Sequence, residues 1–391
     1  MNPLTGLQAL VLIPVIAGSA YLIASVWTAW RFRRWARRSA GLAAGFCPAV
    51  TVLKPVCGLE KNLLENLRST VRQDYPDFQV VFSVQRLDDP AIPMLEAVQR
   101  EFGPERVTVA VECCDAGPNG KINNLVGGLK HARHDILVIS DSDVRLRPDY
   151  LKTIVAPLSD PAVGCVCTLY KAVEADRWFE RLELLTINAE LTPNIIFVLM
   201  TGVAKFCLGA STAIRRKDLE QLGGLESLAD YLVEDYEMGR RLWTAGRTVA
   251  IVPYVVDTVV DLKSPSQWWH HLIYWDQNNR AAAPRNFFGT ILIRPVPFAV
   301  LFALATLGSP AGWFVLAGAV TLRLLCASIV LGSVLRDREG LRSLWLVPLR
   351  DCAALVSFLL AYTKRTTVWR DVRFTLTRDG RLVAESSACD A

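Results

Sequence analysis

The stretch Ile-Leu-Val-Ile-Ser-Asp-Ser-Asp, residues 136–143, joins a short apolar run to a pair of aspartates. An apolar run rich in β-branched residues is typical of a buried strand in a parallel sheet. Asp141 and Asp143 follow at the point where this strand is expected to end. In open α/β sheets, ligands bind beyond the carboxyl ends of the strands. The stretch therefore predicts a strand that carries two carboxylates to a ligand site.

Strand and helix patterns alternate on the N-terminal side of this stretch. Short apolar, β-branched runs predict four strands, at Ala49–Leu53, Phe78–Val84, Val107–Val111 and Ile136–Ile139. Apolar residues at helical spacing predict the intervening helices, at Glu60–Val71, Ile92–Phe102 and Ile122–His131. This alternation is typical of an α/β fold whose mixed, mostly parallel sheet is covered by helices on both faces.

The pattern after residue 143 is less regular. Helical spacing predicts helices at Trp178–Met200, Ala229–Ala245 and Gln267–Ala283. Thr248–Val256 has the composition of a strand, and Val372–Val383, with Asp379-Gly380 at its centre, predicts a small hairpin.

The N-terminus has the composition of a membrane anchor. The chain has 391 residues and is 52% hydrophobic, with a mean hydropathy of +0.27. Leu7–Trp30 is nearly uninterrupted apolar sequence, long enough to cross a hydrocarbon core of about 30 Å as a helix. No Lys or Arg precedes it, which argues against a cleaved signal peptide. Five arginines follow it: Arg31, Arg33, Arg34, Arg37 and Arg38. The positive-inside rule places them, and the globular region after them, in the cytoplasm.

The C-terminal region is again apolar. Phe287–Leu307 and Gly312–Leu335 are each long enough to span and predict a membrane hairpin. Trp345–Tyr362 is also apolar, but Arg350 and Asp351 interrupt it, and charges are costly at mid-membrane. A re-entrant or interfacial helix pair is therefore expected there. The tail beyond it is basic, which favours a cytosolic location; its cations are Lys364, Arg365, Arg370 and Arg373.

Cysteine usage and net charge exclude some classes of protein. The 10 cysteines include no pair at zinc-finger spacing, and a disulfide framework is not expected in a cytosolic domain. The cysteines, among them Cys113, Cys114, Cys165 and Cys167, are therefore expected to be small buried residues. The net charge of +5 is explained largely by the arginines flanking the membrane segment, so no nucleic-acid partner is indicated.

Asp141 and Asp143 are the strongest candidate site residues. Two carboxylates at this spacing can hold one Mg²⁺ or Mn²⁺, ions that prefer hard oxygen ligands. Surface turns often contain the same spacing, so the position after a predicted strand is what favours a metal site. Asp88 and Asp89 follow the second strand in the same way. Asp89 is expected to cap the next helix, which leaves Asp88 freer to contact a ligand.

Two further segments carry candidate groups. Gly117–Asn124 opens a predicted helix, where backbone N–H groups suit a phosphate and Lys121 could add a positive charge. The alternative is a glycine-rich turn with a surface lysine. Glu234-Asp235 is expected inside a helix, where partial burial could tune Asp235 as a general base. The alternative is a solvated helix face.

The segment Gln267–Arg280 is dense in aromatic, amide and basic side chains, including His271, Trp275 and Arg280. Such side chains suit recognition of a sugar or a diphosphate. The alternative is an aromatic belt at a membrane interface. A zinc site at the adjacent His270 and His271 would lack further ligands at recognisable spacing.

Together these motifs resemble the ceramide glucosyltransferase family, of the inverting GT-A, family 21 type, and within it the bacterial branch associated with hopanoid biosynthesis. The resemblance covers roughly residues 48–297 and the arrangement of membrane segments. Five motifs carry it: Val52–Gly58, Gln85–Ala91, Lys121–Leu125, Asp141–Asp143 and Glu234–Tyr236. The family implies a Rossmann-like GT-A sheet that binds a nucleotide-diphospho-sugar, with transmembrane helices at both ends.

The resemblance also implies a role for each motif. The Asp88-Asp89 pair would contact the nucleotide, and Lys54 and Lys121 would line its diphosphate. Asp141 and Asp143 would hold the metal ion. Asp235 would be the general base.

One family motif departs from the pattern. The closing (Gln/Arg)-x-x-Arg-Trp motif aligns with His271–Trp275, so Trp275 is kept while His271 and Tyr274 replace the expected cationic positions. Arg280 could supply the missing charge. The animal ceramide enzymes also have a histidine where this chain has Thr192 before Pro193. Both departures favour a bacterial polycyclic lipid over ceramide as the acceptor.

The resemblance implies an integral membrane glycosyltransferase of the bacterial inner membrane, which moves a hexose or N-acetylhexosamine from a UDP-sugar to a lipid hydroxyl, ceramide-like or hopanoid. Four parts are expected: an N-terminal anchor (1–38), a cytosolic GT-A domain (48–284), membrane or re-entrant helices (285–363) and a cytosolic tail (364–391). A processive polysaccharide synthase and a degraded nucleotide-sugar-binding protein remain alternatives.

Overall fold

The computed structural model describes residues 3–39, 45–202, 204–363, 366–369, 372–377 and 380–384. The chain forms two compact units that interleave along the sequence. The sheet unit comprises residues 35–171, 203–261 and 368–391, and the helical unit comprises residues 1–34, 172–202 and 262–367. Each unit is described in turn.

The described part of the sheet unit is built on an eight-stranded sheet with the strand order β3-β2-β1-β4-β7-β6-β8-β5. Its first half consists of β1 (Val50–Pro55), β2 (Phe78–Val84), β3 (Val107–Val111) and β4 (Ile136–Ser140). β1 pairs in parallel with both β2 and β4, and β2 pairs in parallel with β3. Every residue of β1, β2 and β4 is buried, which explains why they appear in the sequence as mostly apolar runs. The four predicted strands, their parallel pairing and the mixed sheet are confirmed.

The other half of the sheet is antiparallel and was largely missed by the sequence analysis. β7 (Ser211–Arg215) runs antiparallel to β4, and β6 (Val163–Val173) runs antiparallel to β7. The short strand β5 (Val144–Arg145) pairs with β8 (Thr248–Val259), which extends beyond the predicted Thr248–Val256. Of these four strands, only β8 was predicted.

Helices follow the parallel strands as expected. α2 (Leu63–Val71), α3 (Ile92–Phe102) and α4 (Gly120–Leu129) come after β1, β2 and β3. α4 packs on β1 and β2. Its approach to β2 is close at Gly128, where an added Cβ would lie 2.9 Å from Ser83 Oγ. Further along the chain lie α5 (Tyr150–Val155), η1 (Ala156–Ser159), α8 (Arg216–Gln221) and η3 (Glu226–Leu228).

The helix predicted at Ala229–Ala245 begins later than expected. α9 spans Glu234–Thr244, and Val233 before it has a φ of −114° and a ψ of 70°. Val233 has no side chain that can accept a hydrogen bond from the first turn, so the sequence carries no capping signal at the true start. The correction moves Glu234 and Asp235 from the interior of a helix to its first turn.

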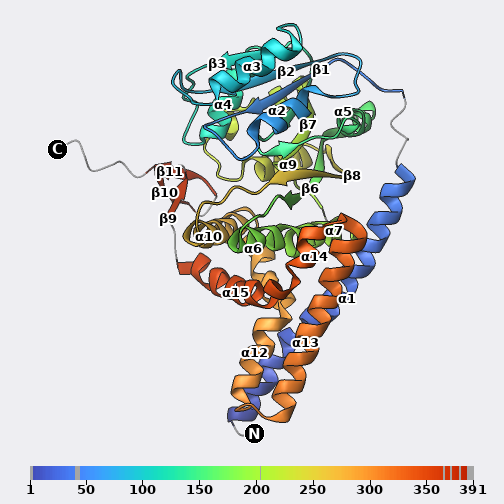
Figure 1. Ribbon diagram of the computed structural model, residues 1–391, viewed down its shortest axis with the longest axis vertical. Helices are drawn as coiled ribbons and strands as arrows, with labels where there is room; N and C mark the ends of the chain where they lie inside the picture. Colours follow the sequence, from blue (N-terminus) through green and yellow to red (C-terminus); the bar gives the residue numbers. More distant parts are fainter. Residues whose placement is uncertain are drawn as a thin grey trace, which may run out of the picture. The chain divides into compact units, whose positions relative to one another are not determined.

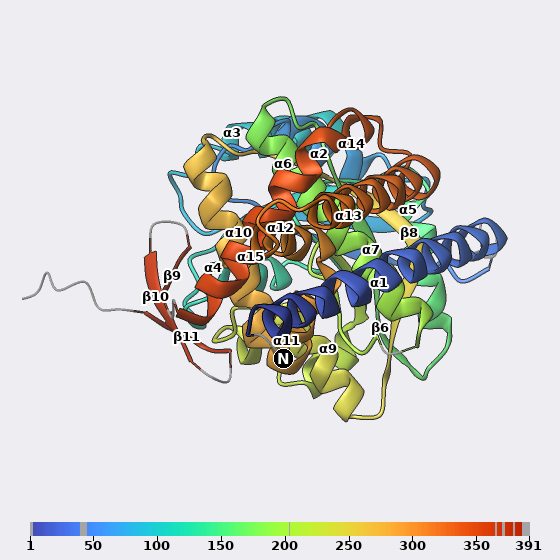
Figure 2. The ribbon, with the colours of Figure 1, turned by 90° about the horizontal axis from the view of Figure 1, so that it is seen from below.

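The predicted C-terminal hairpin is present. β10 (Val372–Leu376) and β11 (Leu382–Ala384) are antiparallel, with Phe374 opposite Ala384, and β9 (Thr366–Trp369) completes a three-stranded sheet (Figure 2). The hairpin joins the rest of the sheet unit through a hydrogen bond from Leu382 N to Asp230 O, 2.8 Å long. Parts of the predicted tail, at 364–365, 370–371, 378–379 and 385–391, lie outside the described residues; they include Lys364, Arg365, Arg370 and Asp379.

Three helices of the helical unit run alongside one another: α1 (Pro3–Ser39), α12 (Pro295–Ala305) and α13 (Pro310–Ile329). Val15, Ala299 and Ala319 form their shared core. Four other helices of this unit lie across them in Figure 1: α6 (Trp178–Thr186), α7 (Thr192–Met200), α10 (Pro265–Ala282) and α15 (Val347–Thr363). The π-helical turn η2 (Ile187–Leu191) joins α6 to α7, so the predicted helix over Trp178–Met200 is confirmed.

The remaining elements of the helical unit are short. They are α11 (Pro284–Gly289), η4 (Thr290–Ile293), η5 (Val330–Leu335), α14 (Arg338–Arg342) and η6 (Leu344–Leu346).

Four helices in the described part of the chain are long and apolar enough to cross a membrane: Gly6–Ser39, Trp178–Met200, Pro310–Leu335 and Leu344–Thr363. The span predicted over Phe287–Leu307 corresponds to a bent helix pair, which is either a broken span or a re-entrant loop. The chain bends by 56° between Pro284–Ile293 and Pro295–Ala305. The bend lies at Arg294, because the following proline disfavours a helical conformation there.

Cysteine burial agrees only in part with the prediction. Cys165 and Cys167, on β6, and Cys207 are buried. Cys47 and Cys113 are exposed, so the expectation that the cysteines are small core residues is wrong for these two.

Candidate functional site

The sheet unit brings three of the predicted site segments together at one point. The Lys121 ammonium, in the first turn of α4, lies 2.8 Å from Asp141 Oδ1 and 3.0 Å from Glu234 Oε1. Asp141 follows β4, and Glu234 opens α9. Although desolvation favours the neutral amine, the charges of Asp141 and Glu234 hold the Lys121 pKa well above its usual range. Residues far apart in the sequence thus form one charged cluster beyond the carboxyl end of β4.

Asp141 and Asp143 lie on the connection between β4 and β5. Desolvation by the surrounding protein raises the pKa of both carboxyl groups. The Asp143 pKa reaches about 7, because the charges of Asp141 and Glu60 add to the effect of desolvation. A bound cation would relieve this crowding of negative charge, so the two carboxylates fit a divalent metal ion.

The protein supplies few further ligands for such an ion. Among the residues that the structure describes, no group of three or more His, Cys, Asp or Glu side chains could hold a metal. Mg²⁺ and related ions are commonly held by one or two carboxylates, with water and substrate phosphates completing the coordination. Asp141 and Asp143 match that arrangement.

Asp235 lies beside Glu234 in the first turn of α9, where the helix dipole favours negative charge. Desolvation, followed by the charge of Glu234, nevertheless raises the Asp235 pKa to about 7. Gly209 leaves room for the carboxylate, since an added Cβ there would lie 3.0 Å from Asp235 Oδ2. A carboxylate poised near neutral pH can accept a proton from a bound hydroxyl group.

Asn119 connects the start of α4 to α9, a role that the sequence analysis missed. Its side-chain oxygen accepts hydrogen bonds from Lys121 N at 3.0 Å and Ile122 N at 3.2 Å. Its Nδ2 donates to Tyr231 O at 2.9 Å and Glu234 Oε2 at 3.3 Å. Two of the N–H groups expected to bind phosphate are therefore already capped. Asparagine before the first turn of a helix is the signal that could have predicted this cap.

The structure buries Lys54, the lysine that the resemblance placed along the diphosphate. Its side chain is fully buried, and its ammonium donates to Asp141 O at 2.7 Å, Val144 O at 3.0 Å and Ser140 Oγ at 3.4 Å. Burial lowers the Lys54 pKa to about 8. The structure thus places this lysine beneath the segment that carries the aspartates, with no surface open to a diphosphate.

Asp88 and Asp89 differ in their burial and in their hydrogen-bond partners. Asp89 is buried and accepts hydrogen bonds from Gly58 N at 3.0 Å and Ala91 N at 2.9 Å. It braces the turn before α3, whose capping residue is Ala91, so the predicted helix cap is misplaced by two residues. Asp88 is exposed and pairs with Arg86 at 2.6 Å, so it is the freer of the two carboxylates, as expected.

Three other predicted site residues, His271, Trp275 and Arg280, belong to α10 in the helical unit. His271 Nδ1 lies 2.9 Å from Glu183 Oε1, and its ring stacks on Tyr274 with centroids 6.1 Å apart. The Trp275 ring meets the same imidazole edge-on, with centroids 5.8 Å apart. The Arg280 guanidinium lies over the Tyr362 ring, 5.4 Å from its centroid. The contacts described for His271, Trp275 and Arg280 therefore all lie within the helical unit.

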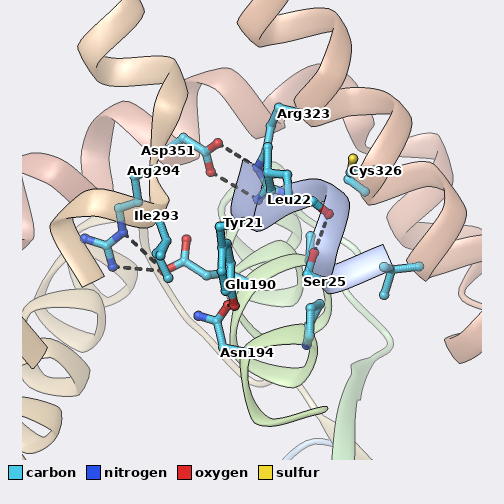
Figure 3. A pocket seen from close by; sticks show the side chains of 14 residues that line it. Tyr21, Leu22, Ser25, Glu190, Asn194, Ile293, Arg294, Arg323, Cys326 and Asp351 are labelled. Atoms are coloured by element: carbon cyan, nitrogen blue, oxygen red, sulfur yellow. Dashed lines mark hydrogen bonds and ion pairs between the residues drawn. The ribbon is translucent and has the colours of Figure 1, made fainter. Parts of the chain in front are cut away.

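The helical unit also holds a cluster of buried ion pairs around a small cavity (Figure 3). Arg294 NH2 lies 2.9 Å from Glu190 Oε1, and Arg323 Nε lies 2.8 Å from Asp351 Oδ2. Arg350 joins the two pairs, because its guanidinium contacts both Glu190 and Asp351. The charges that interrupt the apolar run of α15 are thus paired inside the unit.

Known proteins resemble this chain in sequence. The model of glycosyl transferase family 21 matches residues 10–382. The chain is 28% identical over 210 residues to ceramide glucosyltransferase 1 of Caenorhabditis elegans, which covers 52% of this chain and 44% of that protein. It is 25% identical over 262 residues to the ceramide glucosyltransferase of Pyricularia oryzae, and this match covers 52% of this chain and 51% of that protein. The chain spans about half the length of these relatives.

Among solved structures, the mannosyltransferase PcManGT of Pyrobaculum calidifontis, in complex with GDP-Man and Mn²⁺, resembles this chain. The TM-score is 0.50 at 23% identity, over 90% of this chain and 99% of that one. This likeness concerns the fold, and it confirms the predicted GT-A architecture.

Proposed function

The chain belongs to glycosyl transferase family 21, and from that membership we propose that it transfers a sugar from a nucleoside diphosphate donor to the hydroxyl group of a membrane lipid. The donor is a UDP-hexose or UDP-N-acetylhexosamine, and the acceptor is a ceramide-like lipid or a hydroxylated hopanoid. The observation that carries this proposal is the cluster in which Lys121 contacts Asp141 and Glu234, beside Asp235. It combines oxygen ligands, a cation and a base at one strand end.

Asp141 and Asp143 would hold Mg²⁺ or Mn²⁺. When bound, the ion supplies positive charge that offsets the charge of the departing nucleoside diphosphate. Lys121 adds an ammonium group on the same side of the site, where its side chain is 20% exposed. A metal ion held by the carboxylates and the ammonium group of Lys121 would together attract the negative charge of a diphosphate.

Asp235 is the general base of the proposed reaction. Its carboxylate takes the proton of the acceptor hydroxyl while that oxygen attacks the anomeric carbon of the sugar. The bond between the anomeric carbon and the diphosphate oxygen breaks in the same displacement, and the configuration inverts. A pKa of about 7 allows Asp235 to be ionised at neutral pH and yet basic enough to accept the proton.

The lipid acceptor is supported by the apolar helices. The described residues include four helices long and apolar enough to cross a membrane, and arginines follow the first apolar segment. We infer an integral protein of a bacterial inner membrane whose sheet unit faces the cytosol. The names of the ceramide glucosyltransferases support a sphingolipid-like acceptor, whereas the departures at His271, Tyr274 and Thr192 favour a polycyclic one.

A direct assay tests the proposal. The purified protein in lipid nanodiscs is incubated with radiolabelled UDP-glucose or UDP-N-acetylglucosamine, Mn²⁺ or Mg²⁺, and either ceramide or a hydroxylated hopanoid. The extracted lipids are then separated by chromatography. We expect label in a lipid product, lost with EDTA and lost in Asp235→Asn.

The exposed Asp230 offers a matched control, since Asp230→Asn changes a neighbouring carboxylate without touching the cluster. Donor binding by folded protein without label in any lipid would contradict the transferase and favour a binding protein. Labelled polymer that stays out of the lipid extract would favour a processive synthase.

A further inference from the structure

Lys54 is a fully buried lysine whose ammonium donates to the segment bearing the two aspartates and to the strand end before it. Its place follows from the strand register. β1 and β4 are parallel neighbours, and Leu53 lies opposite Ile139, so Lys54 comes next to Ser140. From there its ammonium reaches the carbonyl oxygens of Asp141 and Val144, which flank Ser142 and Asp143.

Lysine suits this position for a chemical reason. An ammonium group has three donors and no acceptor, and here three oxygens surround it. Lysine is almost never fully buried unless it is paired, because removing its charge from water is costly. The bonds to two backbone carbonyls tie both ends of the turn through Ser142 and Asp143 to β1. Asn66, also buried, supports the same turn from below, with Nδ2 3.4 Å from Ser142 O.

We propose that Lys54 is a positioning residue that fixes the backbone of residues 140–144, so that Asp141 and Asp143 are held ready for a divalent metal ion, and that it does not contact the nucleotide diphosphate. This inference rests on the proposed function. It assigns two tasks of the site to different lysines: Lys54 supports the backbone that carries the carboxylates, and the partly exposed Lys121 faces the ligand.

The test separates metal binding from nucleotide binding. Mn²⁺ binding without donor is followed by the electron paramagnetic resonance signal of the free ion, and binding of radiolabelled UDP without metal is followed by equilibrium dialysis. Three variants are compared with the wild type: Lys54→Met, Lys54→Gln and Lys152→Met. Lys152 is the matched control, because its ammonium is exposed and pairs with Asp74 at 2.7 Å, away from the cluster.

We expect Lys54→Met to raise the Mn²⁺ dissociation constant by about 10- to 100-fold, the usual effect of removing a group that orients metal ligands. Lys54→Gln keeps two N–H donors and should lose less. UDP binding without metal should match the wild type in both variants, and Lys152→Met should change neither quantity. Thermal unfolding of each variant reports folding, and if Lys54→Met does not fold, Lys54→Gln and Ser140→Ala carry the comparison.

Two results would overturn the proposal. Weaker UDP binding in the absence of metal, with Mn²⁺ binding unchanged, would place Lys54 at the diphosphate. If Lys54→Met and Lys54→Gln both bind Mn²⁺ more tightly than the wild type, and by the same factor, the lysine affects the ion only through its positive charge. Absence of Mn²⁺ binding by the wild-type protein would instead refute the metal site of the proposed function, and this role with it.

Discussion

Lys121 and Asp141 form an ion pair, with the ammonium nitrogen 2.8 Å from the carboxylate oxygen Oδ1. The carboxylate proposed to bind the metal is therefore already engaged by a cation of the protein. A metal ion and Lys121 compete for it, and a diphosphate would offer the ammonium a new partner. Binding of a metal ion at Asp141 and binding of a diphosphate at Lys121 should therefore affect one another.

Replacing Lys121 by methionine should separate these two effects. Without the ammonium, Asp141 is free for the ion, so we expect Lys121→Met to bind Mn²⁺ more tightly than the wild type in the absence of donor. The same variant should bind the UDP-sugar more weakly, because a cation facing the diphosphate is lost. Isothermal titration with Mn²⁺ alone, and then with UDP at saturating Mn²⁺, measures both changes. Weaker binding of both ligands would indicate that Lys121 mainly holds the site together.

Removal of either metal-binding carboxylate should abolish Mn²⁺ binding and transfer together. We expect Asp143→Asn and Asp141→Asn to behave as the wild type does in EDTA, because one carboxylate and its neighbours cannot replace the pair. Asp135→Asn, at the opposite end of β4 and 96% exposed, is the control and should keep full activity. Retained Mn²⁺-dependent transfer in Asp143→Asn would contradict the assignment of the metal site.

The dependence of activity on pH should report the ionisation of Asp235. A base must be deprotonated to act, and the Asp235 pKa is raised to about 7, first by desolvation and then by the charge of Glu234. The value of kcat/KM should therefore be high above pH 7 and should fall as the pH drops through that value. A pH profile at saturating Mn²⁺ measures this decrease.

Glu234 offers a second variant for the same profile. Glu234→Gln removes the neighbouring negative charge while leaving a carbonyl oxygen to accept from Lys121, so the Asp235 pKa should fall and the decrease should move to lower pH. Glu226→Gln, an exposed change on the segment before α9, should leave the profile unmoved. If kcat/KM decreases at the same pH in Glu234→Gln as in the wild type, a group other than Asp235 controls the decrease.

The parallel half of the fold was predictable from sequence for a physical reason. Buried parallel strands are continuous apolar runs, and the residues after them, such as Asp141, must lie at one edge of the sheet. β6 and β7 were not predicted, because Val163–Val173 mixes glycine, cysteine and threonine and its partner strand lies some 40 residues further along the chain. The pattern gave no local signal of that pairing.

The sequence predicted several of the residues that come together in the site, but it did not predict all of the contacts that they make. Asp141, Lys121 and Glu234 come together as the motifs suggested. The role of Lys54 depends on the register of β1 against β4, and the cap provided by Asn119 depends on the approach of α9. Neither is visible in a single sequence, because each arises from the packing of distant segments.

The buried ion pairs of the helical unit should affect stability mainly because each buried charge has a partner of opposite sign. Arg323 is buried and bonds to both carboxylate oxygens of Asp351, at 2.8 Å and 3.3 Å. Asp351→Leu would leave that guanidinium without its carboxylate inside a low-dielectric interior, a change that typically costs about 3–5 kcal/mol. We expect this variant to unfold at a clearly lower temperature in detergent. The double variant Arg323→Met/Asp351→Leu removes both charges and leaves Arg350 with Glu190, so it should recover most of the loss. If the single and double variants unfold at the same temperature, packing volume, and not charge balance, is what Asp351 contributes to these helices.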